Sequence, residues 1–131
     1  MIMNKYRDKS DFEINCQVLE IFEPDIKHMC LSHDEKSFYH FGFDGNGFYE
    51  TTIPDYCNNP ADAMPIIIEN GISLIKFEHN YIAAAPGFFV EGQLGGEIYG
   101  LKSKLFSDNR GPYRAAMEVF LMMKDAENEK V

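Results

Sequence analysis

The segment CNNPADAMPIIIENG, residues 57–71, most narrows what this chain can fold into, because it marks both ends of a helix. Asn59 is a favourable N-cap, and Pro60 suits the first helical position, where its missing N–H costs nothing. Asp62 places a negative charge in the positive first turn. An Asn-Gly pair at 70–71 is a typical helix end. The segment therefore predicts a short helix with defined boundaries.

Pro65 lies inside this helix and removes the hydrogen bond to the carbonyl of Ala61. We therefore expect a bend or a break, with the isoleucines of the second half packed against a sheet on a different axis. The first half has two interpretations. It is a structural helix start, or the kink leaves the polar groups of Asn58, Asn59 and Asp62 free to face a ligand.

Two more helices and a set of antiparallel strands are predicted around this segment. Ser10 and Glu13 form a capping box that begins one helix, which Pro24 ends. Gly111 and Pro112 begin another, which is apolar along most of its length. Aromatic residues and alternation predict a meander with a turn at 44–47, followed by a hairpin; the expected strands span 26–32, 36–43, 48–53, 74–78 and 81–85.

These elements predict a single α+β domain over residues 1–131, in which about three helices pack on an antiparallel sheet made of the meander plus the hairpin. Residues 1–9 are expected to be a lead-in, and the charged tail 125–131 to fray. The glycine-rich segment 86–100 fits an exposed loop, a lid or a bulged hairpin.

Charge and composition exclude several classes of function. The net charge of −9 argues against general nucleic-acid binding, which needs a basic face. Three widely spaced cysteines suit reduced thiols, and no apolar run is long enough to cross a membrane, so we expect a soluble protein of the cytoplasm.

Catalytic and metal-binding patterns are weak. No nucleophile elbow or phosphate-binding glycine loop is present, so we expect neither an enzyme nor a cofactor. Cys57 precedes a helix start, which could lower its pKa, but no base can be assigned to it. The four histidines, with Asp34 and Glu35 nearby, match no metal-ligand template, so no metal is expected; they are His28, His33, His40 and His79.

The helix starts NPADAM (59–64) and GPYRAAM (111–117) resemble each other, each with proline at the first helical position. If the two starts lie close together, Arg110, Arg114 and free backbone N–H groups would form an anion site with Asn58, Asn59 and Asp62. The alternative is a structural ion pair between Asp62 and Arg114 that fastens the two helices.

Three segments, SDFEIN (10–15), CNNPADAMPIIIENGIS (57–73) and PYRAAMEVFLMM (112–123), together resemble the NinX-type family of lambdoid and related phages, a domain of unknown function. The resemblance covers about 35 residues in the family's order. This chain has Met64 where tryptophan is usual and Gly111 where a second asparagine is usual. The resemblance implies a phage accessory protein expressed in the bacterial cytoplasm.

Our first hypothesis is a non-catalytic module that binds a small anionic ligand, sequesters a nucleotide signal of host defence and forms a homo-oligomer. The alternative is an acidic protein-interaction module that inhibits a host or phage enzyme, suggested by the net charge of −9. A small enzyme acting on nucleotides ranks last, because no catalytic set can be named.

Overall fold

A computed structural model describes residues 4–42, 47–87, 89–92, 98–102 and 105–129 of the chain. Its helices are α1 (Asp11–Phe22), the 3₁₀ helix η1 (Pro24–His28), α2 (Pro60–Glu69) and α3 (Pro112–Glu129). Its strands are β1 (Cys30–Leu31), β2 (Ser37–Phe41), β3 (Phe48–Thr52), β4 (Ser73–Phe77), β5 (Asn80–Ala84), β6 (Phe89–Gly92), β7 (Ile98–Lys102) and β8 (Phe106–Asn109).

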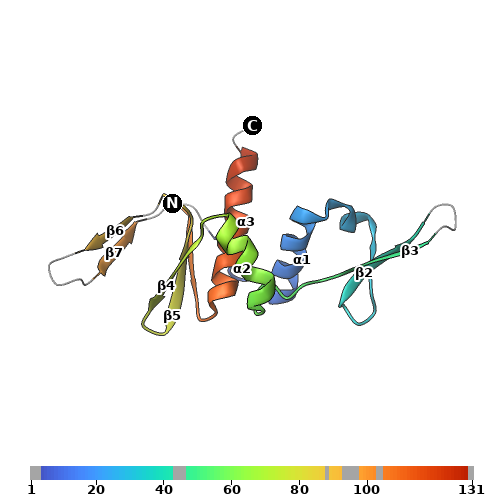
Figure 1. Cartoon of the computed structure of the whole chain (residues 1–131), viewed down its shortest axis with the longest axis horizontal. Coiled ribbons are helices and arrows are strands. Elements are labelled where there is room, and N and C mark those ends of the chain that lie inside the picture. Colours follow the sequence, from blue (N-terminus) through green and yellow to red (C-terminus); the bar gives the residue numbers. More distant parts are fainter. Residues whose placement is uncertain (1–3, 43–46, 88, 93–97, 103–104, 130–131) are drawn as a thin grey trace.

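The predicted α+β class is confirmed, and the described strands fall into separate sheets instead of one. The meander forms a sheet of order β1-β2-β3, and the hairpin joins β8 in a sheet of order β4-β5-β8. β6 and β7 form a third antiparallel pair. Figure 1 shows the helices in the middle of the molecule, with strands extending to both sides.

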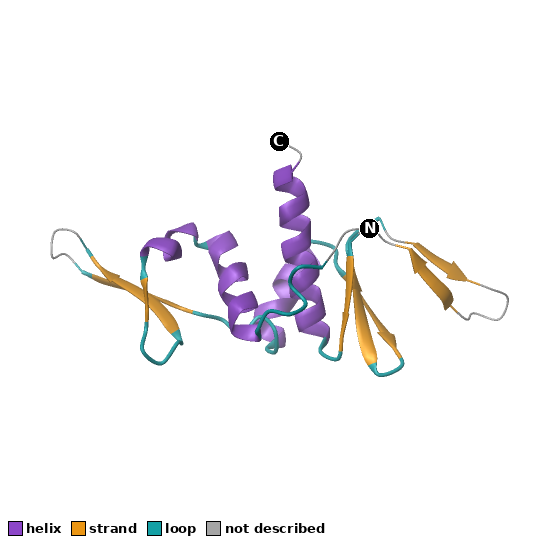
Figure 2. Cartoon of the chain, turned by 180° about the vertical axis from the view of Figure 1, so that it is seen from behind, coloured by secondary structure: helices purple, strands orange, loops and turns teal. Residues whose placement is uncertain are grey.

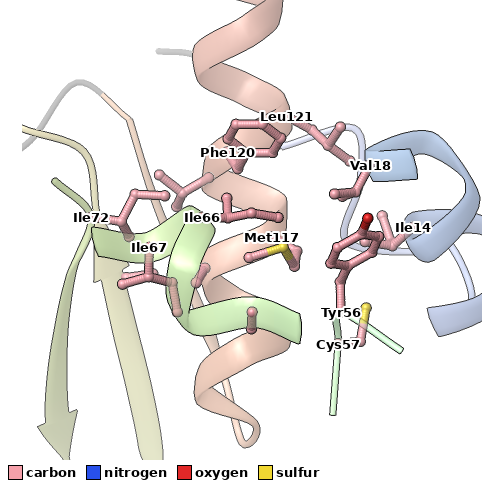
Figure 3. Close-up of a cluster of buried hydrophobic side chains, with 14 of the residues drawn as sticks. Ile14, Val18, Tyr56, Cys57, Ile66, Ile67, Ile72, Met117, Phe120 and Leu121 are labelled. Atoms are coloured by element: carbon pink, nitrogen blue, oxygen red, sulfur yellow. The ribbon is translucent and has the colours of Figure 1, made fainter. Parts of the chain in front are cut away.

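α3 is the centre of the core. It packs against α1, α2 and the sheet β4-β5-β8, so apolar side chains cover it on several sides (Figure 3). Residues 115–122 of α3 are all buried, as the apolar composition of this segment predicts. The core around α3 includes Ile14 and Val18 of α1 and the buried isoleucines Ile66 and Ile67 of α2.

The predicted ends of α2 are confirmed, and of the two effects expected from Pro65, a bend or a break, the break does not occur. The Asn59 side chain accepts a hydrogen bond from the N–H of Ala61, and the helix runs unbroken from Pro60 to Glu69. Pro65 is solvent-exposed, and the fold tolerates one missing backbone hydrogen bond.

The C-terminal end of α2 is a Schellman motif. Gly71, at a φ of 64°, donates its N–H to Ile68 O, and Ile72 donates to Ile67 O. The left-handed conformation at Gly71 explains why glycine follows Asn70. This turn directs the chain straight into β4, where Ser73 begins the second sheet.

Two predictions on local structure need correction. The first expected strand, 26–32, begins instead within the helix η1, because Pro24 starts a 3₁₀ turn that ends at His28, and only Cys30 and Leu31 pair with β2. Strand β8 was not predicted, because its short polar sequence FSDN lacks β-forming alternation. It is a strand because it pairs with β5 on the far side from β4.

Other predicted features lie partly outside the described residues. The turn at 44–47 is described only at Gly47. In the segment 86–100, β6 and β7 form an antiparallel pair with a register shift between Glu91 and Gly92, which favours the bulged hairpin among the three interpretations. α3 continues as a helix through residues 125–129 of the expected frayed tail.

β2 and β3 form a two-stranded projection, which we call the β2–β3 arm (residues 37–41 and 48–52). Both views show it extending away from the helices (Figures 1 and 2). Phe38, at its inner end, packs against the core cluster. Toward the outer end, Phe41 and Phe48 are 73% and 53% exposed.

Candidate functional site

Arg114, predicted as a ligand-binding cation, is instead a buried structural residue at the start of α3. Its side chain is 9% exposed and forms ion pairs with Asp11 and Glu118, each at 2.7 Å. The guanidinium also donates to the backbone carbonyls of Tyr6, Arg7 and Lys9. Its donors are thus directed to protein acceptors, and Arg114 fixes the segment before α1 against α3.

Glu118, one helical turn after Arg114, is buried with 1% of its side chain exposed. Its Oε2 accepts from Arg114, and its Oε1 accepts from Ser107 at 2.9 Å and Asn4 at 2.7 Å. Every acceptor of this carboxylate therefore has a donor, as a buried charge requires. The spacing i,i+4 between Arg114 and Glu118 is the sequence signal that could have predicted this pair.

Asp11 joins the starts of α1, α2 and α3. Its carboxylate accepts from Arg114 on one oxygen and from Asn58 Nδ2, at 3.1 Å, on the other. Burial alone would raise the pKa of Asp11, but the hydrogen bonds from Arg114 and Asn58 lower it below its ordinary value. Burial would lower the pKa of Arg114, and its bonds to Glu118 and Asp11 raise it instead.

The predicted residues at the start of α2 also have internal partners. Asn58 donates to Asp55 as well as to Asp11, and Asn59 caps the helix. Asp62 accepts from the N–H of Asp55 at 3.1 Å. The alternative ion pair between Asp62 and Arg114 is therefore wrong, because each of the two residues is bonded elsewhere.

Cys57 lies beside this cluster as a buried thiol. Burial, followed by the charge of Asp11, raises the pKa of Cys57 to about 12. The sequence-based expectation that the helix start could lower this pKa is wrong, because desolvation of the thiolate dominates. Cys57 is consequently protonated at neutral pH and a poor nucleophile.

Arg110 is the predicted cation that remains available. It is exposed, and no hydrogen bond or ion pair is recorded for it within the described part of the chain. It lines an open pocket of about 820 Å³ with residues of β4, β5 and β8; the other lining residues are Phe77, Glu78, His79, Asn80, Ile82, Phe106 and Asp108.

Strand register explains how this pocket forms. Phe77 is opposite Asn80, Ile82 is opposite Asp108, and Ala84 is opposite Phe106, so these side chains share one face of the sheet. The other face carries Ala83 and Ser107, both buried against α3. Continuing the β5–β8 register by one residue places Arg110 next to Asn80.

The structure thus divides the predicted site in two. Asn58 and Arg114 meet through Asp11 in a satisfied internal network, with Asn59 and Asp62 bonded next to it. Arg110 faces the pocket on the outer side of the sheet β4-β5-β8. Neither a sequence motif nor spacing identifies the aromatic lining of that pocket, since it depends on pairing between β5 and the unpredicted strand β8.

Metal-ligand geometry and membrane-spanning segments were also sought in the described residues. No group of three or more His, Cys, Asp or Glu side chains there could hold a metal ion. None of the helices there is both long and apolar enough to cross a membrane.

Comparison with known proteins gives one family. The model of the family described as bacteriophage P22, NinX, matches residues 5–124. This range includes α1, α2, the described sheets and most of α3. No curated protein and no solved structure matches the chain.

Proposed function

Because this chain belongs to the phage P22 NinX family, we propose that it is a non-catalytic phage accessory protein that binds a small anionic ligand in the host cytoplasm. The ligand class we propose is a nucleotide, whose sequestration would remove a signal of host defence. The site we propose is the pocket on the outer face of the sheet β4-β5-β8, with Arg110 as its cation.

The exposed guanidinium of Arg110 is the observation that supports this proposal. Arg114 is buried and directs its three guanidinium nitrogens to Asp11, Glu118 and backbone carbonyls, so it is less suited to hold a ligand than Arg110. Arg110 lines a pocket and has no recorded partner in the described chain. A free guanidinium presents paired N–H donors that match phosphate oxygens.

The lining of the pocket suits the rest of a nucleotide. Phe77 and Phe106 are 53% and 49% exposed, so each offers an aromatic surface to a planar base. Asn80 adds an amide that can pair with the edge of a base. The volume of about 820 Å³ falls within the range of small-molecule sites.

Titration calorimetry of the full chain with a panel of cyclic and linear nucleotides tests the proposal. We expect at least one nucleotide to bind, and Arg110→Gln to weaken it about tenfold or more, as loss of a charge-assisted hydrogen bond implies. Lys36→Gln is the control, since it removes one positive charge from an exposed position far from the pocket. Binding to none of the panel, or binding that Arg110→Gln leaves unchanged, would contradict the proposal.

A further inference from the structure

A second surface, separate from the Arg110 pocket, lies along the outer edge of β3. Within the described chain β3 pairs with β2 alone, so its other edge is open. Gly42 donates to Gly47 O at 2.7 Å and Ile53 donates to Lys36 O at 2.9 Å. Since antiparallel partners alternate between bonded and non-bonded pairs, the outward backbone groups belong to Phe48, Glu50 and Thr52.

The residues of this edge also carry an aromatic face. Tyr39 and Phe41 of β2 lie on the same face as Phe48 of β3, with ring centroids 5.8 Å apart for Tyr39–Phe48 and 5.5 Å for Phe41–Phe48. Phe41 is 73% exposed and Phe48 53%. Free backbone donors and acceptors of β3 therefore border an exposed apolar surface.

β3 lacks two features that commonly protect free edges. Its sequence, FYETT, has no lysine and no proline, which natural edge strands often use to prevent pairing. Glu50 is its single ionised side chain, and no ion pair is recorded for Glu50 within the described residues. The edge thus combines hydrogen-bonding capacity, apolar surface and one negative charge that no described residue pairs with.

The negative charge of Glu50 determines which added strands can pair favourably with this edge. A second copy that paired antiparallel and symmetrically about the middle of β3 would bring two Glu50 carboxylates directly opposite each other, which is destabilising. A strand with lysine or arginine at that position would instead gain an opposite-charge pair. Charge complementarity therefore favours a different, basic chain.

We propose that the β3 edge accepts an extended strand of a partner protein, by addition to the sheet β1-β2-β3. The partner strand carries apolar side chains against Phe48, whose ring continues the aromatic face of Tyr39 and Phe41, and a lysine or arginine beside Glu50. This surface gives the acidic protein-interaction hypothesis a defined location, and it is independent of the proposed nucleotide pocket.

NMR titration of the full chain with synthetic nine-residue peptides tests this inference. One peptide alternates valine and threonine and has lysine at its central position. The control peptide has the same sequence with glutamate at that position. We expect the lysine peptide to bind about two- to fivefold more tightly, with the largest amide shifts at Phe48, Glu50 and Thr52. Glu50→Lys should reverse the preference between the two peptides.

Thr52→Pro tests the backbone contribution separately. It deletes an outward N–H that the β2–β3 pairing does not use, and proline is tolerated at such edge positions. We expect it to weaken the lysine peptide more than Thr52→Ala, which keeps the N–H. Binding of neither peptide, equal binding of both, or shifts confined to other strands would overturn the inference.

A self-associating chain would overturn it too. We expect sedimentation of the full chain without peptide to show no assembly through the β3 edge. Concentration-dependent assembly that Thr52→Pro abolishes would mean that a second copy occupies this edge. The nucleotide experiments do not bear on these outcomes, since Arg110→Gln alters a different sheet.

Discussion

Arg114 holds several other groups in place through its hydrogen bonds. Its guanidinium connects α3 to Asp11 of α1 and to three carbonyls of the segment before α1. Glu118 completes the network from the same helix. Because arginine stays charged even when buried, these acceptors together compensate for its removal from water.

Arg114→Ala should lower the free energy of unfolding by about 3–5 kcal/mol, because it leaves the buried Glu118 carboxylate without its cation. Arg7→Ala is the matched control. It also removes an arginine from an ion pair, with Asp108, but that pair is exposed and should contribute less than about 1 kcal/mol. Urea denaturation monitored by circular dichroism measures both. An equal loss of unfolding free energy in the two variants would show that burial of the Arg114 network adds no stability.

Asp11 should make stability depend on acid pH. Its pKa is lowered in the folded protein, so the stabilisation is complete above the ordinary carboxyl pKa of about 4 and is lost as the pH falls through the lower folded pKa. At pH 7, Asp11→Asn should cost about 1 kcal/mol, since this side chain is half exposed. Denaturation curves of the wild-type chain and Asp11→Asn give the difference in their free energies of unfolding. We expect this difference to be smaller at pH 3 than at pH 7. A difference in unfolding free energy that is the same at both pH values would contradict a lowered pKa at Asp11.

Helices were more predictable than strands in this chain because their signals are local. Ser10 and Asn59 cap α1 and α2 as their sequence positions indicate. β8 depends on a partner more than 20 residues away in the chain, and nothing in its own four residues indicates a strand. A break at Pro65 was one of the two expected effects, because local rules give the cost of a proline but not whether the surrounding fold outweighs it.

The candidate site was predictable only in part, for a geometric reason. Arg110 and Arg114 are four residues apart, and the turn into α3 separates them. Arg110 precedes the helix and faces the outer side of the sheet, whereas Arg114 lies in the first turn and points inward. The sequence indicates that both are cations near a helix start, and only the packing of α3 determines which one is free.

Pro65→Ala should stabilise the protein by about 1–2 kcal/mol. Alanine restores an N–H that can bond to the carbonyl of Ala61, which favours the helix by up to about 3 kcal/mol, while the unfolded chain gains freedom that offsets part of this. Pro60→Ala is the control and should change little, because the first helical position needs no N–H donor. Thermal unfolding compares the variants. Destabilisation by Pro65→Ala would mean that the proline ring has a packing role despite its exposure.

On the scale of the whole molecule, burial is concentrated around α3 and decreases along the arm. The hairpin β4–β5 and the arm β2–β3 are antiparallel pairs of equal strand length, yet only the first is covered by α3 (Figure 1). The two strand pairs thus have similar local structure but differ in their packing against α3. Comparing them shows the effect of that packing within one chain.

Hydrogen exchange followed by mass spectrometry should separate the two pairs. We expect the slowest exchange in residues 115–122 of α3, intermediate exchange in β4–β5, and the fastest of the three in β2–β3, because amides with few buried contacts open locally at low free energy. Arm amides that are as protected as those of β4–β5 would show that other contacts hold the arm in solution.

The central place of α3 has a consequence for how this protein is made. α3 follows in the chain all of the elements that it covers, so α1, α2 and the sheet β4-β5-β8 leave the ribosome before it. Until residues 112–123 emerge, Ile14, Val18 and the isoleucines of α2 have no helix to pack against. The nascent protein therefore carries uncovered apolar faces throughout that interval, when it is most open to chaperones and to aggregation.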